Sequence, residues 1–174
     1  MTVTEVERNG AAETDIPDRE RESVPREEVL RLLHRACTTL DERRYRHWID
    51  LFAQNGRYIA ISLENFENGW PLAVIDDNRS SMLDRAEMIE KYWSIEPSRT
   101  RRMVSNVEID VAEPNLLKVR SAFVVYVTNS VGQVEIQATG TYYDEICHTD
   151  RWRFLRRTAV HDNDLLTHPV TYPL

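Results

Sequence analysis

The sequence predicts an α+β protein in which a strongly bent antiparallel or mixed sheet wraps around helices. Three observations support this. Apolar residues recur at helical spacing through most of residues 25–93. From residue 99 onward they alternate with polar residues over long segments, as in half-buried strands. Strands that follow helices without regular alternation argue against a parallel α/β sheet, and a bent sheet can bury the apolar faces of the helices.

The first helix is expected to begin near Ser23, with Pro25 in its first turn. Cys37 lies on the apolar face of this helix and is interpreted as a small buried hydrophobe. A second helix follows, and Asn55-Gly56 is expected to stop it. The apolar face of the first helix comprises Val29, Leu32, Leu33, Ala36 and Leu40, and that of the second comprises Tyr45, Trp48, Ile49 and Phe52.

Two short strands and a third helix come next. Residues 57–62 are predicted as a strand, residues 63–69 are polar and rich in turn formers, and residues 70–75 are predicted to return as a second strand. Residues 76–81 form a loop that can cap the third helix. The apolar positions of that helix are Met82, Ala86, Ile89 and Trp93.

Four long strands complete the predicted fold. Met103, Ser105, Val107 and Ile109 are expected to face the same side of the first of them, and residues 113–115 form a turn. The second strand covers residues 117–128, and residues 129–133 are predicted as a hairpin loop with Gly132. Two further strands, residues 134–146 and 152–160, are joined around residues 148–150. The alternating face of the second strand consists of Val119, Ser121, Phe123, Val125 and Val127.

Length and charge limit the classes of function. The 174 residues predict a single domain at residues 23–174, preceded by a disordered polar tail at residues 1–22. The tail has no hydrophobic signal-peptide core, and no apolar run is long enough to span a bilayer, so we expect a cytoplasmic protein without membrane contacts. The net charge of −7 argues against a nucleic-acid binder. Basic clusters at residues 99–102 and 151–157 can face an acidic partner protein.

Four segments, in this order, carry a resemblance to a known family. They are LDERRYRHWIDLFA at residues 40–53 with GRY at 56–58, DNRS at 77–80, PSRTRRMVSNV at 97–107, and WRFLRRTAV at 152–160. Through them the chain resembles the small (beta) subunit of bacterial aromatic-ring-hydroxylating dioxygenases, the Rieske non-haem iron oxygenases. The order of predicted elements is similar to the cone-shaped fold of nuclear transport factor 2-like and cystatin-like proteins.

The resemblance implies a structural subunit that is not itself catalytic. It implies a catalytic alpha subunit as partner, commonly in an α3β3 hexamer with beta–beta contacts. That partner would hold a Rieske [2Fe–2S] cluster and a mononuclear iron, and would oxidise an aromatic ring with O2 and electrons from NADH delivered by a reductase. No catalytic residue, metal or cofactor is expected in this chain. Arg99, Arg101 and Asn106 are expected at the partner interface.

The residues of this chain agree with a non-catalytic subunit whose partner holds the iron centres. The Cys-x-His and Cys-x-x-His motifs of a Rieske centre do not occur in the sequence. A mononuclear iron site needs two histidines and a carboxylate, whereas His161-Asp162 has only His168 nearby, and we interpret both histidines as ordinary polar positions. The guanidinium forks of Arg99 and Arg101 suit carboxylates or carbonyls, within the chain or on the large subunit. A solvated charged loop is the alternative. The Asn106 amide is expected to hold neighbouring backbone.

A second hypothesis is a stand-alone lyase or isomerase of the dehydratase or cyclase type, with acid–base groups inside the cone. Its candidate residues are His47, Asp50, Tyr58, Tyr126, Tyr142 and His161. The apolar Trp48, Ile49 and Phe52 on the same helix indicate that Asp50 points outward. A binding or scaffolding module of the same fold is a third hypothesis. The aromatic substrate, and dioxygenation against monohydroxylation, stay open because the large subunit would select them.

Overall fold

A computed structural model describes residues 25–92, 98–163 and 172–174. The predicted N-terminal tail, residues 1–22, lies outside this part of the chain. The helices are α2 (Arg26–Asp41), α3 (Tyr45–Ile49), α4 (Leu63–Glu67) and α5 (Arg79–Tyr92). The strands are β1 (Phe52–Ser62), β2 (Ile75–Asn78), β3 (Arg99–Glu113), β4 (Leu116–Thr128), β5 (Val134–His148) and β6 (Trp152–His161).

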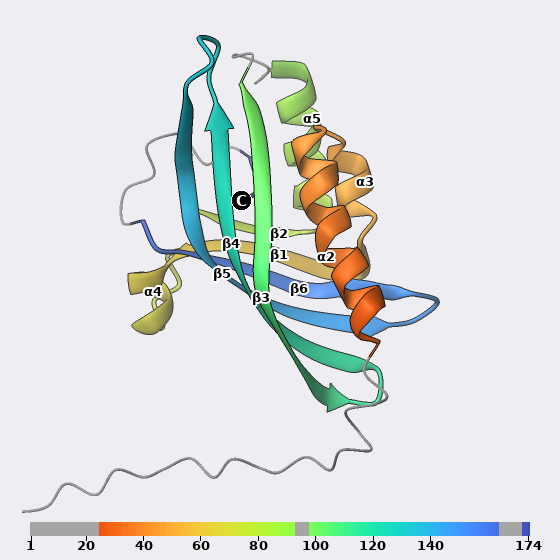
Figure 1. Ribbon diagram of the computed structural model, residues 1–174. Helices are drawn as coiled ribbons and strands as arrows, with labels where there is room; N and C mark the ends of the chain where they lie inside the picture. Colours follow the sequence, from red (N-terminus) through yellow and green to blue (C-terminus); the bar gives the residue numbers. More distant parts are fainter. Residues whose placement is uncertain (1–24, 93–97, 164–171) are drawn as a thin grey trace, which may run out of the picture.

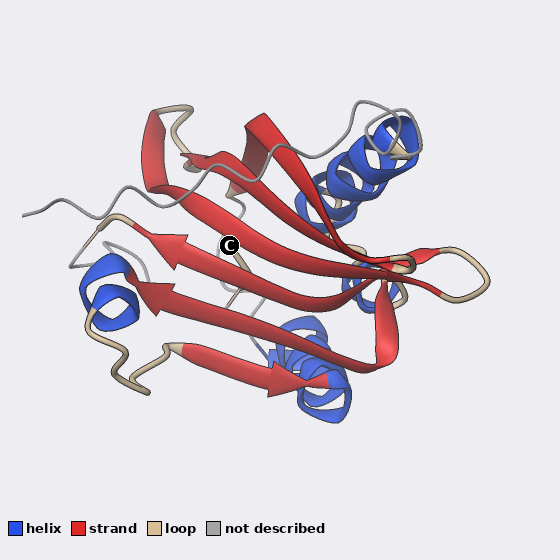
Figure 2. Cartoon of the chain, turned by 90° about the horizontal axis from the view of Figure 1, so that it is seen from below, coloured by secondary structure: helices blue, strands red, loops and turns tan. Residues whose placement is uncertain are grey.

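The strands form one sheet in the order β2-β1-β6-β5-β4-β3. Only the β1–β6 pair is parallel, and the other neighbours are antiparallel. The sheet curves around α2, α3 and α5 (Figure 1), which pack on what we call its inner face. The short α4 lies apart from them (Figure 2), on the outer face, where Phe66 stacks on Tyr143 with ring centroids 5.1 Å apart. The predicted cone-shaped α+β fold with a mixed, strongly bent sheet is confirmed.

The core lies between the inner face and the three helices. Its largest fully buried side chains are aromatic, and the Trp48 ring of α3 meets the rings of Phe52 and Tyr58 edge-on at 4.8 and 5.2 Å. Fully burying one such side chain stabilises the fold by about 1.5–3 kcal/mol. These contacts hold α3 against β1. The fully buried aromatic residues are Phe52, Tyr58, Phe123, Tyr142 and Phe154.

The boundaries of the first two helices differ from the prediction. Pro25 occupies the N-cap position, so α2 begins after it at Arg26; Ser23 lies outside the described residues. All five predicted apolar residues of α2 are buried, as is Cys37. The second helix ends at Ile49, and Phe52 already begins β1.

Asn55-Gly56 does not stop a helix but lies inside β1, where the pairing with β6 is irregular between residues 52 and 57. Gly56 is required there because a Cβ atom would come within 2.9 Å of the Ala53 carbonyl oxygen and 3.2 Å of the Phe154 carbonyl oxygen. Glycine is favoured both at a bulge of this kind and at the end of a helix, so the sequence alone does not distinguish the two.

The predicted second strand at residues 70–75 is wrong, because β2 begins only at Ile75 and continues to Asn78. Leu72 and Val74 are exposed, whereas Ile75 and Asp77 are buried. The predicted loop at residues 76–81 is wrong, because β2 continues to Asn78 and α5 begins at Arg79. The predicted cap from this segment is present: the Ser81 amide donates to Asn78 Oδ1 at 3.0 Å. The predicted buried face of α5 is confirmed for Met82, Ala86 and Ile89. Trp93 lies outside the described residues.

The first long strand, β3, does not keep a single alternation. Asn106 has a left-handed φ of 52°, and pairing advances three residues on β3, from Ser105 to Glu108, for two on β4. This bulge changes which side chains face inward. Before it, Arg102 is buried and Met103 is exposed; after it, Val107 and Ile109 pack on the core. The expectation that Met103, Val107 and Ile109 share a face is therefore wrong.

The remaining long strands agree with the prediction. Of the predicted face of β4, residues 119, 121, 123 and 125 are buried, whereas Val127 is only partly buried. In the β4–β5 loop, the Asn129 side-chain oxygen accepts from the Val131 and Gln133 amides, and Gly132 has a φ of 83°. Among the helices that the structure describes, none has both the length and the hydropathy needed to cross a membrane.

Candidate functional site

Arg99 and Arg101 lie on the outer face of β3, and both side chains are exposed. Directly opposed residues share a face of the sheet. Arg101 is opposite Tyr126 of β4, which is opposite Ile136 of β5. Arg99 likewise shares its face with Val134 through Thr128. Within the described residues neither guanidinium group makes a hydrogen bond or an ion pair.

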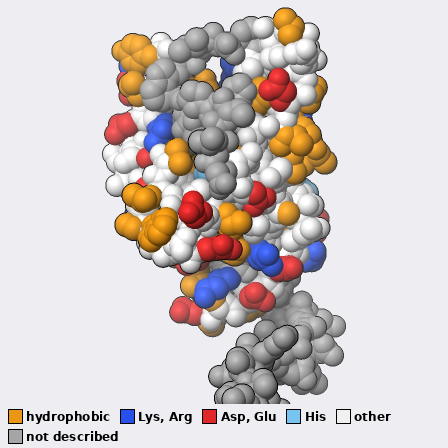
Figure 3. All heavy atoms as spheres, turned by 90° about the vertical axis from the view of Figure 1, so that its left-hand side faces the viewer, with side chains coloured by type: hydrophobic (Ala, Val, Ile, Leu, Met, Phe, Trp, Pro, Cys, Tyr) orange, Lys and Arg blue, Asp and Glu red, His pale blue; other side chains and the backbone are white. Residues whose placement is uncertain are grey.

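These residues border an exposed apolar area, which we call the β3–β5 outer surface: Arg99, Arg101, Met103, Tyr126, Val134 and Ile136. Met103, Val134 and Ile136 expose 60%, 64% and 56% of their surface. Figure 3, which looks onto the left-hand side of Figure 1, shows hydrophobic side chains gathered in separate groups among charged ones. An apolar surface rimmed by arginines is suited to bind another protein.

Asn106 lies apart from the two arginines, at the bulge of the same strand. Its side chain is exposed and makes no hydrogen bond within the described part of the chain, so the observed role of this residue lies in its backbone. Asparagine tolerates the left-handed conformation better than most residues. The structure thus brings Arg99 and Arg101 together and leaves Asn106 farther along β3.

Arg102, directly after the predicted interface arginines, has a structural role that the sequence did not indicate. Its Nη1 atom lies 2.6 Å from Asp41 Oδ1, and Asp41 also accepts from the Arg102 amide at 2.9 Å and from the Thr100 hydroxyl at 3.2 Å. Its Nη2 atom donates to the Pro173 carbonyl at 2.6 Å. Arg102 therefore joins the end of α2, strand β3 and residues 172–174 inside the cone.

The DNRS segment also has a structural role. Asp77 is buried and accepts two hydrogen bonds from Arg85 of α5, at 2.5 and 3.2 Å. Arg79 donates to the Ile49 carbonyl at 2.6 Å and to Asp50 Oδ1 at 3.1 Å. Together with the Asn78 cap, these contacts fasten α5 to β2 and to the end of α3.

A second buried ion pair lies on the inner face of β5 and β6. Arg157 Nε is 3.6 Å from Asp144 Oδ1, and the guanidinium carbon lies 3.7 Å above the Tyr142 ring and 4.7 Å from the Phe154 ring centre. Burial raises the pKa of Asp144 to about 7, although Arg157 opposes the shift. The expectation that residues 151–157 form one basic surface is therefore wrong for Arg157. In the sequence, Asp144 stands at an alternating position between the apolar residues Tyr142 and Ile146. This spacing could have indicated that Asp144 is buried.

The residues of the lyase or isomerase hypothesis are not gathered at one place. His47 and Asp50 are exposed, and Asp50 is paired with Arg79, as its predicted outward direction implied. Tyr126 belongs to the outer surface, whereas Tyr142 is stacked on Phe123 in the core. His161 is the last residue of β6, where it is buried and its Nδ1 atom lies 2.8 Å from the Asn163 carbonyl oxygen. His168 lies outside the described residues.

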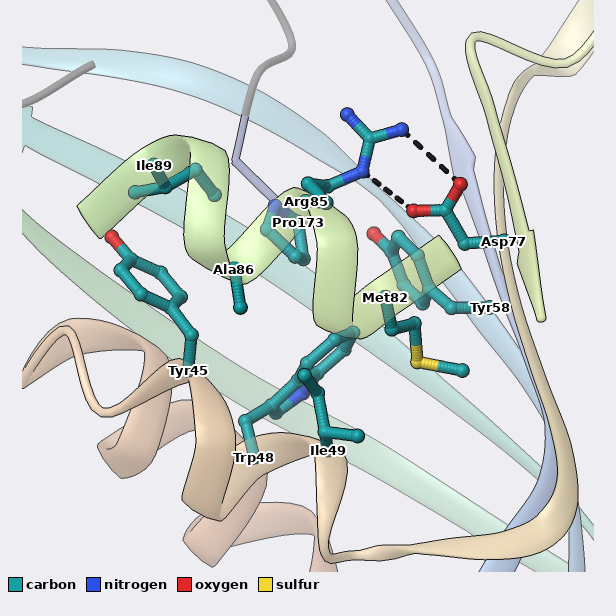
Figure 4. Close-up of a pocket in the computed structure, with 10 residues that line it drawn as sticks. All are labelled: Tyr45, Trp48, Ile49, Tyr58, Asp77, Met82, Arg85, Ala86, Ile89 and Pro173. Carbon is teal, nitrogen blue, oxygen red and sulfur yellow. Dashed lines mark hydrogen bonds and ion pairs between the residues drawn. The ribbon is translucent and has the colours of Figure 1, made fainter. Parts of the chain in front are cut away.

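A small pocket lies between α3, α5 and residue 173 (Figure 4). Its volume of about 10 Å³ is close to the room that one water molecule needs. The Tyr58 hydroxyl points into this region, and burial raises its pKa to about 12. Within residues 25–92, 98–163 and 172–174, no group of three or more His, Cys, Asp or Glu side chains is arranged to hold a metal ion. The pocket lining comprises Tyr45, Trp48, Ile49, Tyr58, Asp77, Met82, Arg85, Ala86, Ile89 and Pro173.

Fold and site together define the class: a cone-shaped α+β protein with a packed interior and an apolar, arginine-bearing outer surface. The family model described as "Ring hydroxylating beta subunit" matches residues 35–168, so the chain belongs to the family of ring-hydroxylating dioxygenase beta subunits. Proteins of this family are subunits of dioxygenase complexes that contain alpha subunits, and the beta subunit is generally the non-catalytic partner.

Individual relatives agree with the family. The chain is 25% identical to the small subunit of anthranilate 1,2-dioxygenase from Burkholderia cepacia over 149 residues, 84% of this chain and 92% of that protein. It is 30% identical to the beta subunit of biphenyl 2,3-dioxygenase from Rhodococcus jostii (strain RHA1) over 124 residues, 64% and 66% of the two chains. A solved structure of naphthalene 1,2-dioxygenase with indole bound in the active site superposes with a TM-score of 0.73 at 21% identity, over 88% of this chain and 86% of that one, which shows a shared fold.

Proposed function

We propose that this chain supports the assembly of the catalytic alpha subunits of an aromatic-ring-hydroxylating dioxygenase, and that it binds its neighbour through the β3–β5 outer surface. In this proposal the complex is an α3β3 hexamer with beta–beta contacts. The alpha subunit carries the Rieske [2Fe–2S] cluster and the mononuclear iron, and a reductase delivers electrons from NADH. The complex works in the cytoplasm, where NADH is available, in the catabolism of an aromatic compound.

The exposed arginine pair is the observation that supports this interface. Arg99 and Arg101 are two residues apart on one face of β3, so their Cα atoms are separated by roughly 7 Å. Each guanidinium fork can take one carboxylate in a two-point contact. Met103 and Ile136 beside them would exclude water from such contacts, which raises their contribution to binding.

Asn106 is part of the same proposal. Its exposed amide carries both donors and an acceptor, and the bulge at this position interrupts the regular edge of β3. A bulged edge resists indiscriminate strand pairing with other chains. The contact at Asn106 is therefore proposed to involve its side chain and not the addition of a strand.

The proposal is tested by co-expressing the tagged chain with its large subunit and measuring the amount of large subunit that co-purifies. The variant Arg99→Glu/Arg101→Glu should lower that amount at least tenfold, because four charge units change at the interface. Arg35→Glu, at an exposed arginine of α2, is the matched control and should retain full co-purification. If the double variant retains as much large subunit as the control does, the β3–β5 outer surface is not the interface.

A further inference from the structure

Residues 172–174 lie inside the cone, where they contact α3, β1 and β3. In Figure 1 the label C lies among the strands of the curved sheet, between β4 and β3 in this view. The Leu174 side chain is only 2% exposed and belongs to the same core cluster as Trp48 and Tyr58. The Tyr172 ring stacks on the ring of Tyr45 at a centroid distance of 6.1 Å.

Three hydrogen bonds fix the main chain of this segment, one of them a long one of 3.5 Å from the Tyr58 hydroxyl to the Leu174 carbonyl. The Leu174 amide donates to the Tyr58 hydroxyl at 2.8 Å, and the Pro173 carbonyl accepts from Arg102 Nη2 at 2.6 Å. Both protein groups are buried and need a partner, because an unsatisfied buried polar group is costly. The segment thus presents one apolar side chain, an amide and a carbonyl to the interior, and these are groups that a small molecule can also present.

Pro173 forms part of the wall of the pocket in Figure 4, opposite the aromatic rings of Trp48 and Tyr58. Withdrawal of residues 173 and 174 would join this pocket to the space that the two side chains now fill. The enlarged site would have mainly apolar walls, with Asp77 and Arg85 already paired to each other. Two directional polar groups would be released by the withdrawal, the Tyr58 hydroxyl and the Arg102 guanidinium. Such a combination is typical of small-molecule sites.

We propose that residues 172–174 are an intramolecular plug, and that the space they fill is a binding site for a small acyl compound. The ligand has an apolar group of about leucine size, a carbonyl oxygen that accepts from Arg102, and an N–H or O–H that donates to Tyr58. The plug and the ligand compete for the same contacts. The apparent affinity is therefore reduced by the fraction of molecules in which the plug is in place.

The test uses N-acetyl-prolyl-leucinamide as the probe, since it reproduces the Pro173 carbonyl and the Leu174 amide and side chain. Binding is measured by calorimetry to the full chain and to a variant that stops after residue 171. The variant should bind the probe at least tenfold more tightly than the full chain. Adding Tyr58→Phe to the variant should weaken binding severalfold, because one buried hydrogen bond is lost. Equal affinity of the full and shortened chains, or no binding to either, overturns the proposal.

A second variant keeps the test decisive if the shortened chain does not fold. Leu174→Ala in the full chain weakens the plug while leaving its main chain in place, and it should also bind the probe more tightly than wild type. Leu72→Ala removes an exposed leucine and serves as the control, with unchanged affinity. If Leu174→Ala and Leu72→Ala bind the probe equally, residues 172–174 do not cover a ligand site.

Discussion

The buried pair of Asp41 and Arg102 makes a sharp prediction about stability. The two side chains are 6% and 3% exposed. Asp41 accepts hydrogen bonds from Thr100 and from both the backbone and the side chain of Arg102. Replacing Asp41 by alanine leaves the guanidinium group buried without its counter-ion. We expect Asp41→Ala to lower the free energy of unfolding by about 3–5 kcal/mol.

The assay is urea denaturation of the purified chain at neutral pH, followed by tryptophan fluorescence. Asp76→Ala is the control, because the Asp76–Arg57 pair is about half exposed on both sides and such a pair contributes only about 0.2–1 kcal/mol. A further variant, Asp41→Leu/Arg102→Met, should recover most of the loss since no unpaired charge remains. If Asp41→Ala costs no more than Asp76→Ala, the reasoning about this pair is wrong.

Two other predictions concern the sheet. Gly140→Ala should cost about 3 kcal/mol or more in urea denaturation, because its Cβ atom would lie 2.0 Å from the Val160 carbonyl oxygen. Gly69→Ala, with φ at 66° and open space around it, should cost only about 1 kcal/mol, and equal losses would contradict the packing argument. Burial raises the pKa of Asp144 to about 7. The folded chain then keeps a proton that the unfolded chain releases near pH 4, so this group's stabilisation is lost as pH rises from 4 through 7. Asp144→Asn should flatten that dependence between pH 5 and 8, and an unchanged slope would exclude Asp144 as its source.

The sequence predicts those parts of the fold whose periodicity is uninterrupted. The face of α2 that contains Leu32 and Leu33 and the face of β4 that contains Phe123 follow directly from apolar spacing. Bulges were not predicted, because they depend on the partner strand. Asn106 and Gly56 each interrupt a pairing that only the folded sheet defines. The bulge at Asn106 reversed the expected direction of Met103, and Gly56 was mistaken for a helix stop.

The candidate site likewise contains residues that the sequence identifies and residues that it does not. Arg99 and Arg101 were selected by resemblance, and the structure adds the apolar residues that surround them. In the sequence, Arg102 and Arg157 belong to clusters of basic residues. In the structure, both are buried against a carboxylate. Sequence spacing cannot identify such partners, because Asp41 lies 61 residues from Arg102. The role of Leu174 inside the cone has no periodic signal either, since only three residues carry it.

The central claim is that this chain contributes to assembly while the oxygen chemistry belongs to another polypeptide. The most direct measurement is iron content and turnover for the chain alone, the large subunit alone, and the two recombined. We expect the chain to contain no stoichiometric iron, and full turnover to appear only after recombination, together with a hexamer by native mass spectrometry. An equimolar iron content in the isolated chain, or full turnover by the large subunit alone, would contradict the claim.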